Sequence, residues 1–407
     1  MSNVVQKSYG EPLKQNFNLR TAREEASRCL LCYDAPCSQS CPAGTDPAKF
    51  IRSLRFKNLK GAAETVRINN PLAGCCAEVC PCGALCEEAC SRTGIDRPIE
   101  IGKIQRFLVQ TEREQNMVFL HKECERREHI ACVGAGPASL ACARELALMG
   151  YHVTVYEEKE KAGGMLSYEI VSSRLPQEAV EFDLKTIKDL GVEFRYNEKI
   201  DEKKLEDLKE KYDAVFIGTG LWKAKMPSLP GIELKGAVSA LDFLKEIRLK
   251  GKEAELKGPV VVIGGGDVAM DAATAAAQLG AKTTVVYRRS LKEAPADMDE
   301  VLLVESMGIP IIQEFAPESL SGKDGCLQAV DFKGRDGESA LSLKAGTAVF
   351  AIGQTEDEST KEIKAGGKVF AGGDRTNGGK TVVEAVAEGK ENARRISEFL
   401  GSQKGGN

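Results

Sequence analysis

Two segments of this chain repeat one pattern: an apolar strand, a glycine-rich turn, an Ala-rich helix and a second strand. The first reads HIACVGAGPASLACARELALMGYHVTVYEE, and the second reads PVVVIGGGDVAMDAATAAAQLGAKTTVVYRR. The two helices are followed by Gly150 and Gly280. Strand, helix and strand in this order predict a parallel sheet covered by helices. From His129 onward we therefore expect an α/β structure.

The glycine-rich turns have the spacing of dinucleotide-binding loops. Glycines let the backbone approach a pyrophosphate, and the following helix N-terminus supplies free amides and the positive end of its dipole. Ser139 and Ala269 stand where a third glycine is common, and both are small enough for helix–strand packing. We expect one dinucleotide at each turn, the alternative being a tight connection that binds nothing. The turn residues are Gly134, Ala135, Gly136, Pro137, Ala138 and Ser139, and then Gly264, Gly266 and Val268.

The residue that closes each unit differs in charge. Glu157 closes the first, and a carboxylate there accepts hydrogen bonds from a ribose 2′-hydroxyl and repels a 2′-phosphate. Arg288 and Arg289 close the second, and guanidinium groups suit a 2′-phosphate through charge and bidentate geometry. The first unit is therefore predicted to bind FAD and the second NADPH.

Three later segments are expected to complete the flavin site. KYDAVFIGTG, which ends at Gly220, and GTAVFAIGQ are apolar strands that lead into glycine. KVFAGGD ends in Gly373 and Asp374, and a helix then begins near Thr381. This order resembles the two-dinucleotide-binding flavoproteins, in which the Asp meets the ribityl chain and the helix N-terminus faces the flavin ring. The alternative for Asp374 is a loop or N-cap residue.

The fold class expected is α/β, with two Rossmann-like domains preceded by an α-helical domain. The flavin domain is discontinuous because its last segment lies near the C-terminus, and the NADPH domain is inserted in it. We place the helical domain at 1–125, the two parts of the FAD domain at 126–226 and 345–407, and the NADPH domain at 227–344.

Composition limits the partners and the compartment. The net charge of −4 gives no general reason to expect nucleic acid or an anionic membrane as a partner. The N-terminal MSNVVQKSYGEPLKQN has no apolar stretch typical of a signal peptide, and no apolar run is long enough to span a bilayer. We therefore expect a cytoplasmic protein with reduced thiols rather than disulfides.

The cysteines are unevenly distributed, since ten of the fourteen lie between Cys29 and Cys90. They form two runs, RCLLCYDAPCSQSCP and CCAEVCPCGALCEEAC. The first run resembles the bacterial ferredoxin spacing C-x2-C-x2-C-x3-C-P with a longer middle gap. Zinc is the alternative, because its thiolate sites also favour C-x2-C, but zinc cannot carry electrons away from a flavin. Two [4Fe–4S] clusters are therefore predicted in this region.

No residue is predicted to act as a catalytic acid or base. The nucleotide-binding regions contain no C-x-x-C pair, which argues against a disulfide reductase. The chain has only three histidines, and we expect each to be structural. Hydride transfer from a nicotinamide to a flavin needs alignment of the two rings rather than a proton-transfer group.

These motifs together resemble one family. The segments EEASRCLLCYDAPCSQSCPAGTDPAKFIRS, NNPLAGCCAEVC and PIEIGKIQRF are similar to the N-terminal part of dihydropyrimidine dehydrogenases. The similarity is closest to the separate flavin-bearing subunit of the bacterial enzyme. It covers nearly the whole chain, including GAGPAS, the GGM turn, SSRLP, GGGDVAMD and AGGD. The wider superfamily includes the small subunit of glutamate synthase.

The resemblance implies a ligand set for each cluster. One cluster uses Cys29, Cys32, Cys37 and Cys90, and the other uses Cys41, Cys80, Cys86 and Gln105. Spacing alone favours Cys76 over Gln105 as the eighth ligand, because Cys76 completes a C-x3-C pair. The resemblance also adds Met165 and Arg174 to the FAD site, and it adds Gly265, Asp267 and Gly353 to the nicotinamide site.

The function implied is electron input. NADPH, or NADH as in some bacterial relatives, reduces FAD, and two [4Fe–4S] clusters pass the electrons to an FMN-binding TIM-barrel subunit with iron–sulfur clusters of its own. That partner reduces uracil or thymine, so we expect a hetero-oligomer. One alternative is the equivalent module of glutamate synthase or of a ferredoxin-coupled transhydrogenase. Another alternative, of a different class, is a flavin and cluster redox sensor without turnover.

Overall fold

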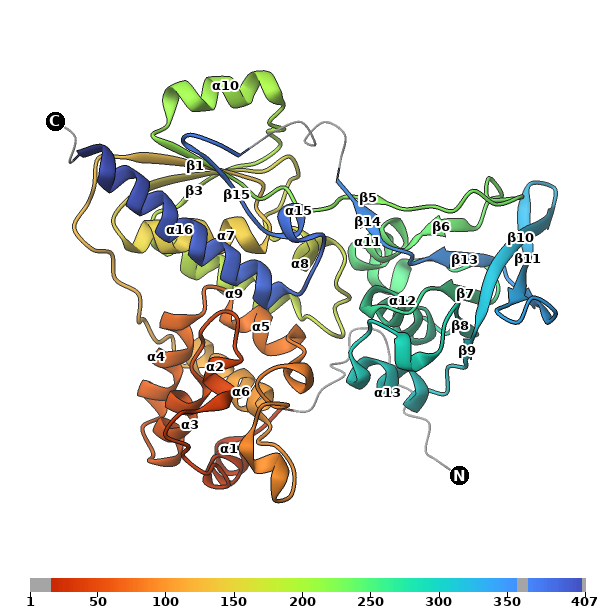
Figure 1. Ribbon diagram of the computed structural model, residues 1–407, viewed down its shortest axis with the longest axis horizontal. Helices are drawn as coiled ribbons and strands as arrows, with labels where there is room; N and C mark the ends of the chain where they lie inside the picture. The colour runs from red at the N-terminus through yellow and green to blue at the C-terminus, as the bar shows by residue number, and fades with distance from the viewer. Residues whose placement is uncertain (1–15, 357–364, 405–407) are drawn as a thin grey trace. The chain divides into compact units, whose positions relative to one another are not determined.

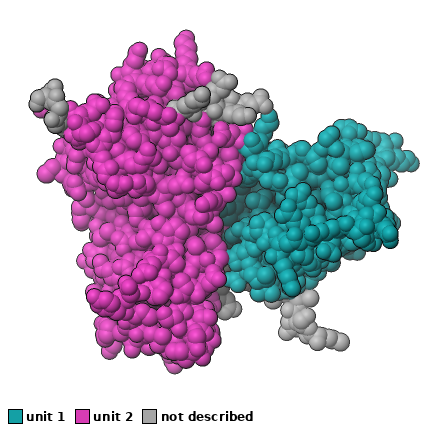
Figure 2. Space-filling model, in the orientation of Figure 1, with its two compact units in different colours: residues 1–13, 168–174, 222–355 teal, residues 14–167, 175–221, 356–407 magenta. Residues whose placement is uncertain are grey.

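The computed structural model describes residues 16–356 and 365–404 (Figure 1). The chain forms two compact units (Figure 2). Among the described residues, unit 1 comprises 168–174 and 222–355, and unit 2 comprises 16–167, 175–221, 356 and 365–404. The chain therefore leaves unit 2 twice, once for a seven-residue segment and once for the long insertion. Within the described ranges, no helix has the length and apolar character needed to cross a membrane.

The N-terminal part of unit 2 is helical, as expected (Figure 1). Its helices are α1 (Leu19–Ser27), α2 (Pro36–Gln39), α3 (Pro47–Arg55), α4 (Leu59–Asn69), α5 (Ala73–Val79), η1 (Cys82–Ala84), η2 (Ser91–Gly94) and α6 (Ile101–Glu114). Local sequence explains the start of α3, where the Asp46 carboxylate accepts from the Lys49 N–H and proline follows at the first helical position. The apolar residues Phe50, Ile51 and Leu54 recur at helical spacing and are buried in the core of this part.

The first nucleotide-binding segment builds a parallel sheet in unit 2, with strand order β15-β4-β1-β2-β3. The strands are β1 (His129–Val133), β2 (His152–Tyr156), β3 (Glu193–Arg195), β4 (Ala214–Ile217) and β15 (Val369–Ala371). The helices are α7 (Pro137–Leu148), α8 (Met165–Tyr168), α9 (Gln177–Asp189), α10 (Glu202–Lys211), α15 (Asp374–Asn377) and α16 (Val382–Lys404). β15 comes from the end of the chain and pairs with β4, so this sheet is discontinuous in sequence.

α16 packs closely along α7, as the blue and yellow helices in Figure 1 show. Gly389 makes this approach possible, because a Cβ there would overlap the carbonyl oxygen of Ala138. α16, which follows the loop at Gly373 and Asp374, is thereby fixed against α7, which begins at the first glycine turn.

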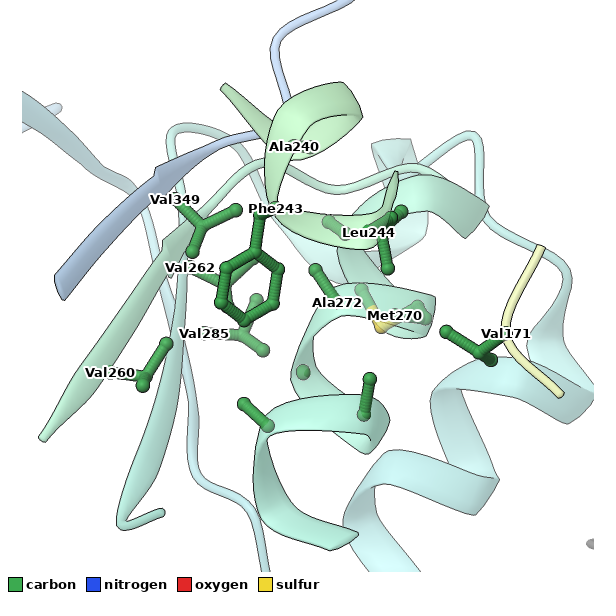
Figure 3. Close-up of a cluster of buried hydrophobic side chains, with 14 of the residues drawn as sticks. Val171, Ala240, Phe243, Leu244, Val260, Val262, Met270, Ala272, Val285 and Val349 are labelled. Carbon is green, nitrogen blue, oxygen red and sulfur yellow. The ribbon is translucent and has the colours of Figure 1, made fainter. Parts of the chain in front are cut away.

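The second segment builds another parallel sheet, in unit 1, with strand order β6-β13-β7-β8-β9. These strands are β6 (Ala237–Ser239), β7 (Val260–Ile263), β8 (Thr283–Tyr287), β9 (Ile311–Gln313) and β13 (Thr347–Phe350). The helices are α11 (Ala240–Lys250), η3 (Gly251–Glu253), α12 (Asp267–Gln278), η4 (Leu291–Glu293) and α13 (Met298–Ser306). Strand residues Val260, Val262, Val285 and Val349 meet Phe243 and Met270 of the helices in the core of this unit (Figure 3).

One strand is placed differently from the prediction. The sequence grouped GTAVFAIGQ with the flavin domain, whereas β13 from this segment pairs with β6 and β7 in the second sheet. Its apolar run is fully buried and would suit either sheet, so composition alone could not assign it.

Two further sheets were not predicted from the sequence. One is the antiparallel sheet β10-β11-β12 (Phe315–Lys323, Cys326–Gly334, Ala340–Lys344), and the other is the short pair β5 (Lys223–Ala224) and β14 (Gln354–Thr355). The predicted α/β class with a helical N-terminal domain is confirmed.

Candidate nucleotide and cluster sites

The first glycine turn lies at the carboxyl end of β1, where open parallel sheets bind their ligands. Gly134 has a φ of +85°, and a Cβ there would lie 2.8 Å from the carbonyl oxygen of Gly218, just beyond β4. Gly164, at φ +57°, approaches so closely that a Cβ would lie 2.9 Å from the Cα of Gly136. Ser139 is fully buried at the third position, against Gly218. Gly134, Gly136 and Gly164 therefore bring bare backbone together at this turn, as a pyrophosphate site requires.

Glu157 is held in place by the turn that it closes. Its two carboxylate oxygens accept from the backbone N–H of Ala135 at 2.8 Å and of Lys159 at 2.9 Å. The side chain is only 6% exposed, and burial raises the pKa of this carboxyl. The structure therefore brings Glu157 to the glycine turn, where a ribose hydroxyl would meet it.

The loop that contains Gly373 and Asp374, here called the flavin loop because it is predicted to complete the flavin site, lies against the same turn. A Cβ on Gly373 would be 2.9 Å from the Cβ of Ala138, and the Gly373 N–H donates to Glu388 of α16 at 2.6 Å. Asp374 accepts from the Lys380 N–H at 3.2 Å, and burial raises the pKa of its carboxyl. Thr381 caps α16, since its Oγ1 accepts from the Glu384 backbone N–H at 3.4 Å and its own N–H donates to the Glu384 carboxylate at 3.0 Å. Sequence reasoning did not identify Glu388, a polar residue on a helix with no local motif to mark it.

The second glycine turn repeats this geometry in unit 1. Gly264 has a φ of +155°, and a Cβ there would overlap the carbonyl oxygen of Ala351, just beyond β13. A Cβ on Gly265 would overlap the ring of Tyr287, and Ala269 is fully buried. Asp267 begins α12 and accepts from the Asp297 N–H at 2.8 Å. Glycine is therefore required at corresponding positions in the two turns.

The arginines at the end of the second nucleotide-binding segment, which lies in unit 1, are in a different environment from Glu157. Arg288 and Arg289 are both exposed at the end of β8. Within residues 16–356 and 365–404, neither guanidinium forms an ion pair. Gly353, with a φ of +109°, lies beside Lys225, whose N–H donates to the Gly353 carbonyl. Two uncompensated cations at this position suit an anionic group on a nucleotide ribose.

Met165 and Arg174, which the resemblance added to the FAD site, belong to different compact units. Met165 begins α8 in unit 2, and Gly220 follows β4 there with a φ of +69°. Arg174 belongs to the short segment in unit 1, where it pairs with Asp271 at 2.8 Å and with Glu300 at 3.3 Å. Burial raises the pKa of Asp271 to about 6. In the structure Arg174 thus forms ion pairs with two carboxylates of unit 1, and its contact with FAD stays a prediction.

The first cysteine group lines a cavity. The four thiols are those of Cys29, Cys32, Cys37 and Cys90. The walls of this cavity are otherwise mainly apolar, with residues such as Ile51, Ile99 and Ile101. Burial raises the pKa of the Cys29 thiol and raises that of Cys37 to about 11. Ionised thiolates therefore need the positive charge of bound metal to balance them.

The second cysteine group is more crowded. Cys41, Cys76, Cys80, Cys82 and Cys86 influence one another electrostatically. Hydrogen bonds to Cys82, followed by burial, raise the pKa of both Cys80 and Cys86. Cys82 lies opposite Gly102 of α6, where a Cβ would be 2.9 Å from its sulfur. The ligand sets implied by the family resemblance leave Cys82 out, although the C-P-C spacing already places it beside Cys80.

Gln105 lies on α6, one turn after Gly102, and is buried. Its Nε2 donates to the Ala73 carbonyl at 3.1 Å, which fixes the amide and leaves Oε1 as the atom that could bind iron. Cys76 is also buried, with Asn70 hydrogen-bonded to its sulfur. The eighth ligand is therefore still either Gln105 or Cys76.

Soft sulfur donors in these two groups fit iron–sulfur clusters. A single zinc ion would need its sulfurs about 2.3 Å from one point. In the part of the chain that the structure describes, no set of three or more His, Cys, Asp or Glu side chains has the spacing to hold one metal ion. Cys29, Cys32, Cys37 and Cys90 of the first group line one cavity.

Comparison with known proteins identifies a family for each part of the chain. The family model "Dihydropyrimidine dehydrogenase domain II, 4Fe-4S cluster" matches residues 6–117, and "Pyridine nucleotide-disulphide oxidoreductase" matches residues 128–373. The NAD-dependent dihydropyrimidine dehydrogenase subunit PreT of Salmonella typhimurium is 39% identical over 414 residues, and that of Escherichia coli is 38% identical over 417. In both cases the similarity covers 98% of this chain and 98% of the relative.

Solved structures share the fold of the nucleotide-binding part. Mycobacterium tuberculosis FprA in complex with NADPH matches with a TM-score of 0.58 at 17% identity, covering 69% of this chain and 86% of FprA. Thioredoxin reductase of Lactococcus lactis matches with a TM-score of 0.52 at 20% identity, covering 68% of this chain and 100% of that one. The cluster domain, the nucleotide domains and the similarity over almost the whole length lead to one assignment: this oxidoreductase belongs to the family of dihydropyrimidine dehydrogenase PreT subunits.

Proposed function

We propose that this chain is the electron-input subunit of a dihydropyrimidine dehydrogenase, taking hydride from a nicotinamide nucleotide and delivering single electrons to a partner. The observation that carries this proposal is that both cysteine groups lie in the same compact unit as the flavin-binding turn. α16 begins at the flavin loop, and its Lys390 donates to the carbonyl oxygens of Ala43 at 2.5 Å and Asn69 at 2.6 Å. Since Ala43 lies two residues beyond Cys41, one helix runs from the flavin loop to the second cysteine group.

The residues of the chain bind and orient the cofactors. When bound, the flavin accepts a hydride as an electron pair, and the clusters carry electrons one at a time. Gly134 and Gly136 leave room for the FAD pyrophosphate, Glu157 binds its ribose, and Asp374 meets the ribityl chain. Cys29, Cys32, Cys37 and Cys90 hold one cluster, and Cys41, Cys80 and Cys86 hold the other together with Gln105 or Cys76. No side chain needs to move a proton, because hydride transfer depends on alignment.

We propose NADPH as the nucleotide. The support is the exposed, unpaired charge of Arg288 and Arg289, where a 2′-phosphate would lie. The relatives from Salmonella typhimurium and Escherichia coli are named NAD-dependent, so this proposal separates the present chain from them. A direct comparison of NADPH and NADH as reductants decides between the two.

The proposed partner is an FMN-binding TIM-barrel subunit that reduces uracil or thymine. The relatives are named as subunits, which implies an assembly. The described residues of this chain form no barrel that could house the pyrimidine chemistry. We place the assembly in the cytoplasm, because cluster thiols need a reducing compartment.

The test of this function is a reconstitution. The purified chain alone is expected to reduce an artificial acceptor with NADPH but to leave uracil unchanged. Adding an FMN-containing dihydropyrimidine dehydrogenase subunit should produce NADPH-dependent loss of the uracil absorbance. If a glutamine-amidotransferase chain restored turnover instead, the chain would be an input module of the glutamate synthase type. If no acceptor of any kind were reduced, a redox sensor without turnover would replace this proposal.

A further inference from the structure

The loop after Cys41 turns back on its own sulfur. The Gly44 N–H donates to the Cys41 carbonyl at 3.0 Å, and Gly44 adopts a φ of +66°, which favours glycine. This turn aims Thr45 at Cys41: the Thr45 backbone nitrogen lies 3.4 Å from Sγ and the hydroxyl oxygen 3.3 Å from it. In the free thiol, Cys41 can donate to the hydroxyl. As an iron-bound thiolate Cys41 has no proton, so both contacts become hydrogen bonds donated by Thr45.

Asn70 orients the Thr45 hydroxyl. Its Nδ2 donates to Thr45 Oγ1 at 3.2 Å, so the hydroxyl proton is directed elsewhere, and the sulfur of Cys41 is within its reach. The Asn70 amide is itself fixed, because its Oδ1 accepts from the Leu72 N–H at 3.0 Å. Thr45 and Asn70 are 2% and 1% exposed, so water does not compete for these bonds.

Two further contacts hold the loop in this conformation. Lys390 binds the carbonyls of Ala43 and Asn69, and the Asn69 side chain donates to the Thr45 carbonyl at 3.3 Å. The Cys41 loop is therefore joined to the end of α4 and to α16. The donors that face Cys41 are preorganised by residues from three separate parts of unit 2.

The first cysteine group has a weaker counterpart. There Ser91 Oγ lies 3.5 Å from the Cys32 sulfur in an exposed position, and the backbone N–H groups of Leu31 and Ser38 are hydrogen-bonded to the thiols of Cys29 and Cys37. Hydrogen bonds to cluster sulfurs raise the reduction potential because they stabilise the extra negative charge of the reduced state. The Thr45 hydroxyl is buried, so its hydrogen bond to Cys41 should do this more effectively than the exposed Ser91 hydroxyl does at Cys32.

We propose that Thr45, oriented by Asn70, is the positioning residue that raises the reduction potential of the second cluster through its hydrogen bonds to Cys41. This inference rests on the proposed function, in which Cys41 is a ligand of that cluster.

The test is an EPR-monitored redox titration of the purified, cluster-loaded chain. Thr45→Val keeps the side-chain shape and the backbone donor but removes the hydroxyl, and the midpoint potential of the second cluster should become more negative. Thr45→Ser keeps the hydroxyl and should restore most of the wild-type value. Asn70→Asp places an acceptor against the hydroxyl and should shift the potential in the same direction as Thr45→Val. Ser91→Ala should affect only the first cluster, and by less.

Iron content separates the possible failures. If Thr45→Val retains all its iron and both midpoint potentials are unchanged, the inference about Thr45 is wrong while the cluster assignment stands. If Cys41→Ser retains all its iron and both EPR signals, Cys41 is not a ligand and the cluster assignment itself fails. Should Thr45→Val load poorly, Thr45→Ala removes the same hydroxyl without the added methyl group, and the same shift is expected.

Discussion

The two nucleotide-binding segments have the same backbone arrangement but residues of opposite charge after their second strands, Glu157 after β2 and Arg288 after β8. In each, the first glycine of the turn contacts the carbonyl beyond a neighbouring strand, Gly218 in one case and Ala351 in the other. Glu157 is buried and bound by two N–H groups, whereas Arg288 and Arg289 are exposed and unpaired in the described chain. The shared turn geometry suits a dinucleotide in both cases, and we expect the residue at the end of the second strand, Glu157 or Arg288, to select which dinucleotide binds.

The largest expected effects come from the first glycines. At φ +85°, Gly134→Ala places a Cβ 2.8 Å from the Gly218 carbonyl oxygen, and at φ +155°, Gly264→Ala places one still closer to the Ala351 carbonyl oxygen, which it would overlap. The left-handed conformation alone costs about 1–2 kcal/mol in a non-glycine residue. Gly134→Ala should lose nearly all its FAD, whereas Gly264→Ala should keep FAD but not be reduced by NADPH. The flavin-to-protein ratio and anaerobic bleaching measure the two outcomes.

Gly401→Ala is the matched control for these variants, because a Cβ there meets nothing within 4 Å and the helix α16 tolerates alanine. It should behave as wild type in both measurements. Loss of the same cofactor in Gly134→Ala and Gly264→Ala would contradict the assignment of one nucleotide to each turn.

The next effect concerns the buried carboxylate. Glu157→Gln can accept only one of the two N–H bonds and loses the charge that binds a ribose. Hydrogen bonds to charged groups contribute about 1.5–3 kcal/mol, so FAD binding should weaken by roughly 10- to 100-fold. Flavin fluorescence during titration of the FAD-free protein measures this. The exposed neighbour Glu158→Gln is the control, and equal weakening in both variants would rule out a specific role for Glu157.

The arginines should give a smaller and selective effect. Replacing both Arg288 and Arg289 with alanine removes the cations expected to bind the 2′-phosphate, and the KM for NADPH should rise roughly tenfold. The KM for NADH should stay the same, because NADH has no such phosphate. Lys292→Ala, an exposed cation nearby, controls for net charge. Equal weakening of both nucleotides would mean that the arginines do not read the 2′-position.

The smallest expected effect is a pH dependence confined to unit 1. Burial outweighs the attraction of Arg174 and raises the pKa of Asp271 from 3.8 to about 6. The folded protein then binds this proton more tightly than the unfolded chain, so stability should fall by about 1–3 kcal/mol as pH rises from about 4 to 6. Above that range this contribution is constant. Thermal unfolding of Asp271→Asn should lack the slope, whereas the exposed Asp299→Asn should retain it.

Local patterns predicted the repeated elements well. Glycine turns, alternating strands and helices, and the charge at Glu157 and Arg288 are all readable within 30 residues of sequence. Strand β13 was assigned to the wrong sheet because its four buried residues carry no mark of their neighbours. The pairing of β13 with β7 depends on contacts between distant parts of the chain, which a single sequence does not display.

In the cysteine sites, too, local spacing was predicted from the sequence, whereas contacts between distant segments were not. Spacing placed Cys29, Cys32, Cys37 and Cys41 in one run, whereas the cavity draws in Cys90 and leaves Cys41 with Cys80 and Cys86. Only the family resemblance indicated this exchange. Thr45, Asn70 and Lys390 were not identified at all, because each contacts the Cys41 loop through folding of segments that are far apart or carry no motif.

The most direct test of electron input is an anaerobic spectrophotometric titration of the intact chain, once with NADPH and once with NADH. We expect NADPH to bleach the flavin at much lower concentration than NADH does, and the cluster absorbance then to fall. Bleaching of the flavin without any change in the clusters would contradict transfer from flavin to cluster. If neither nucleotide bleached the flavin, the second glycine turn would not be a working site, and the central claim would fail.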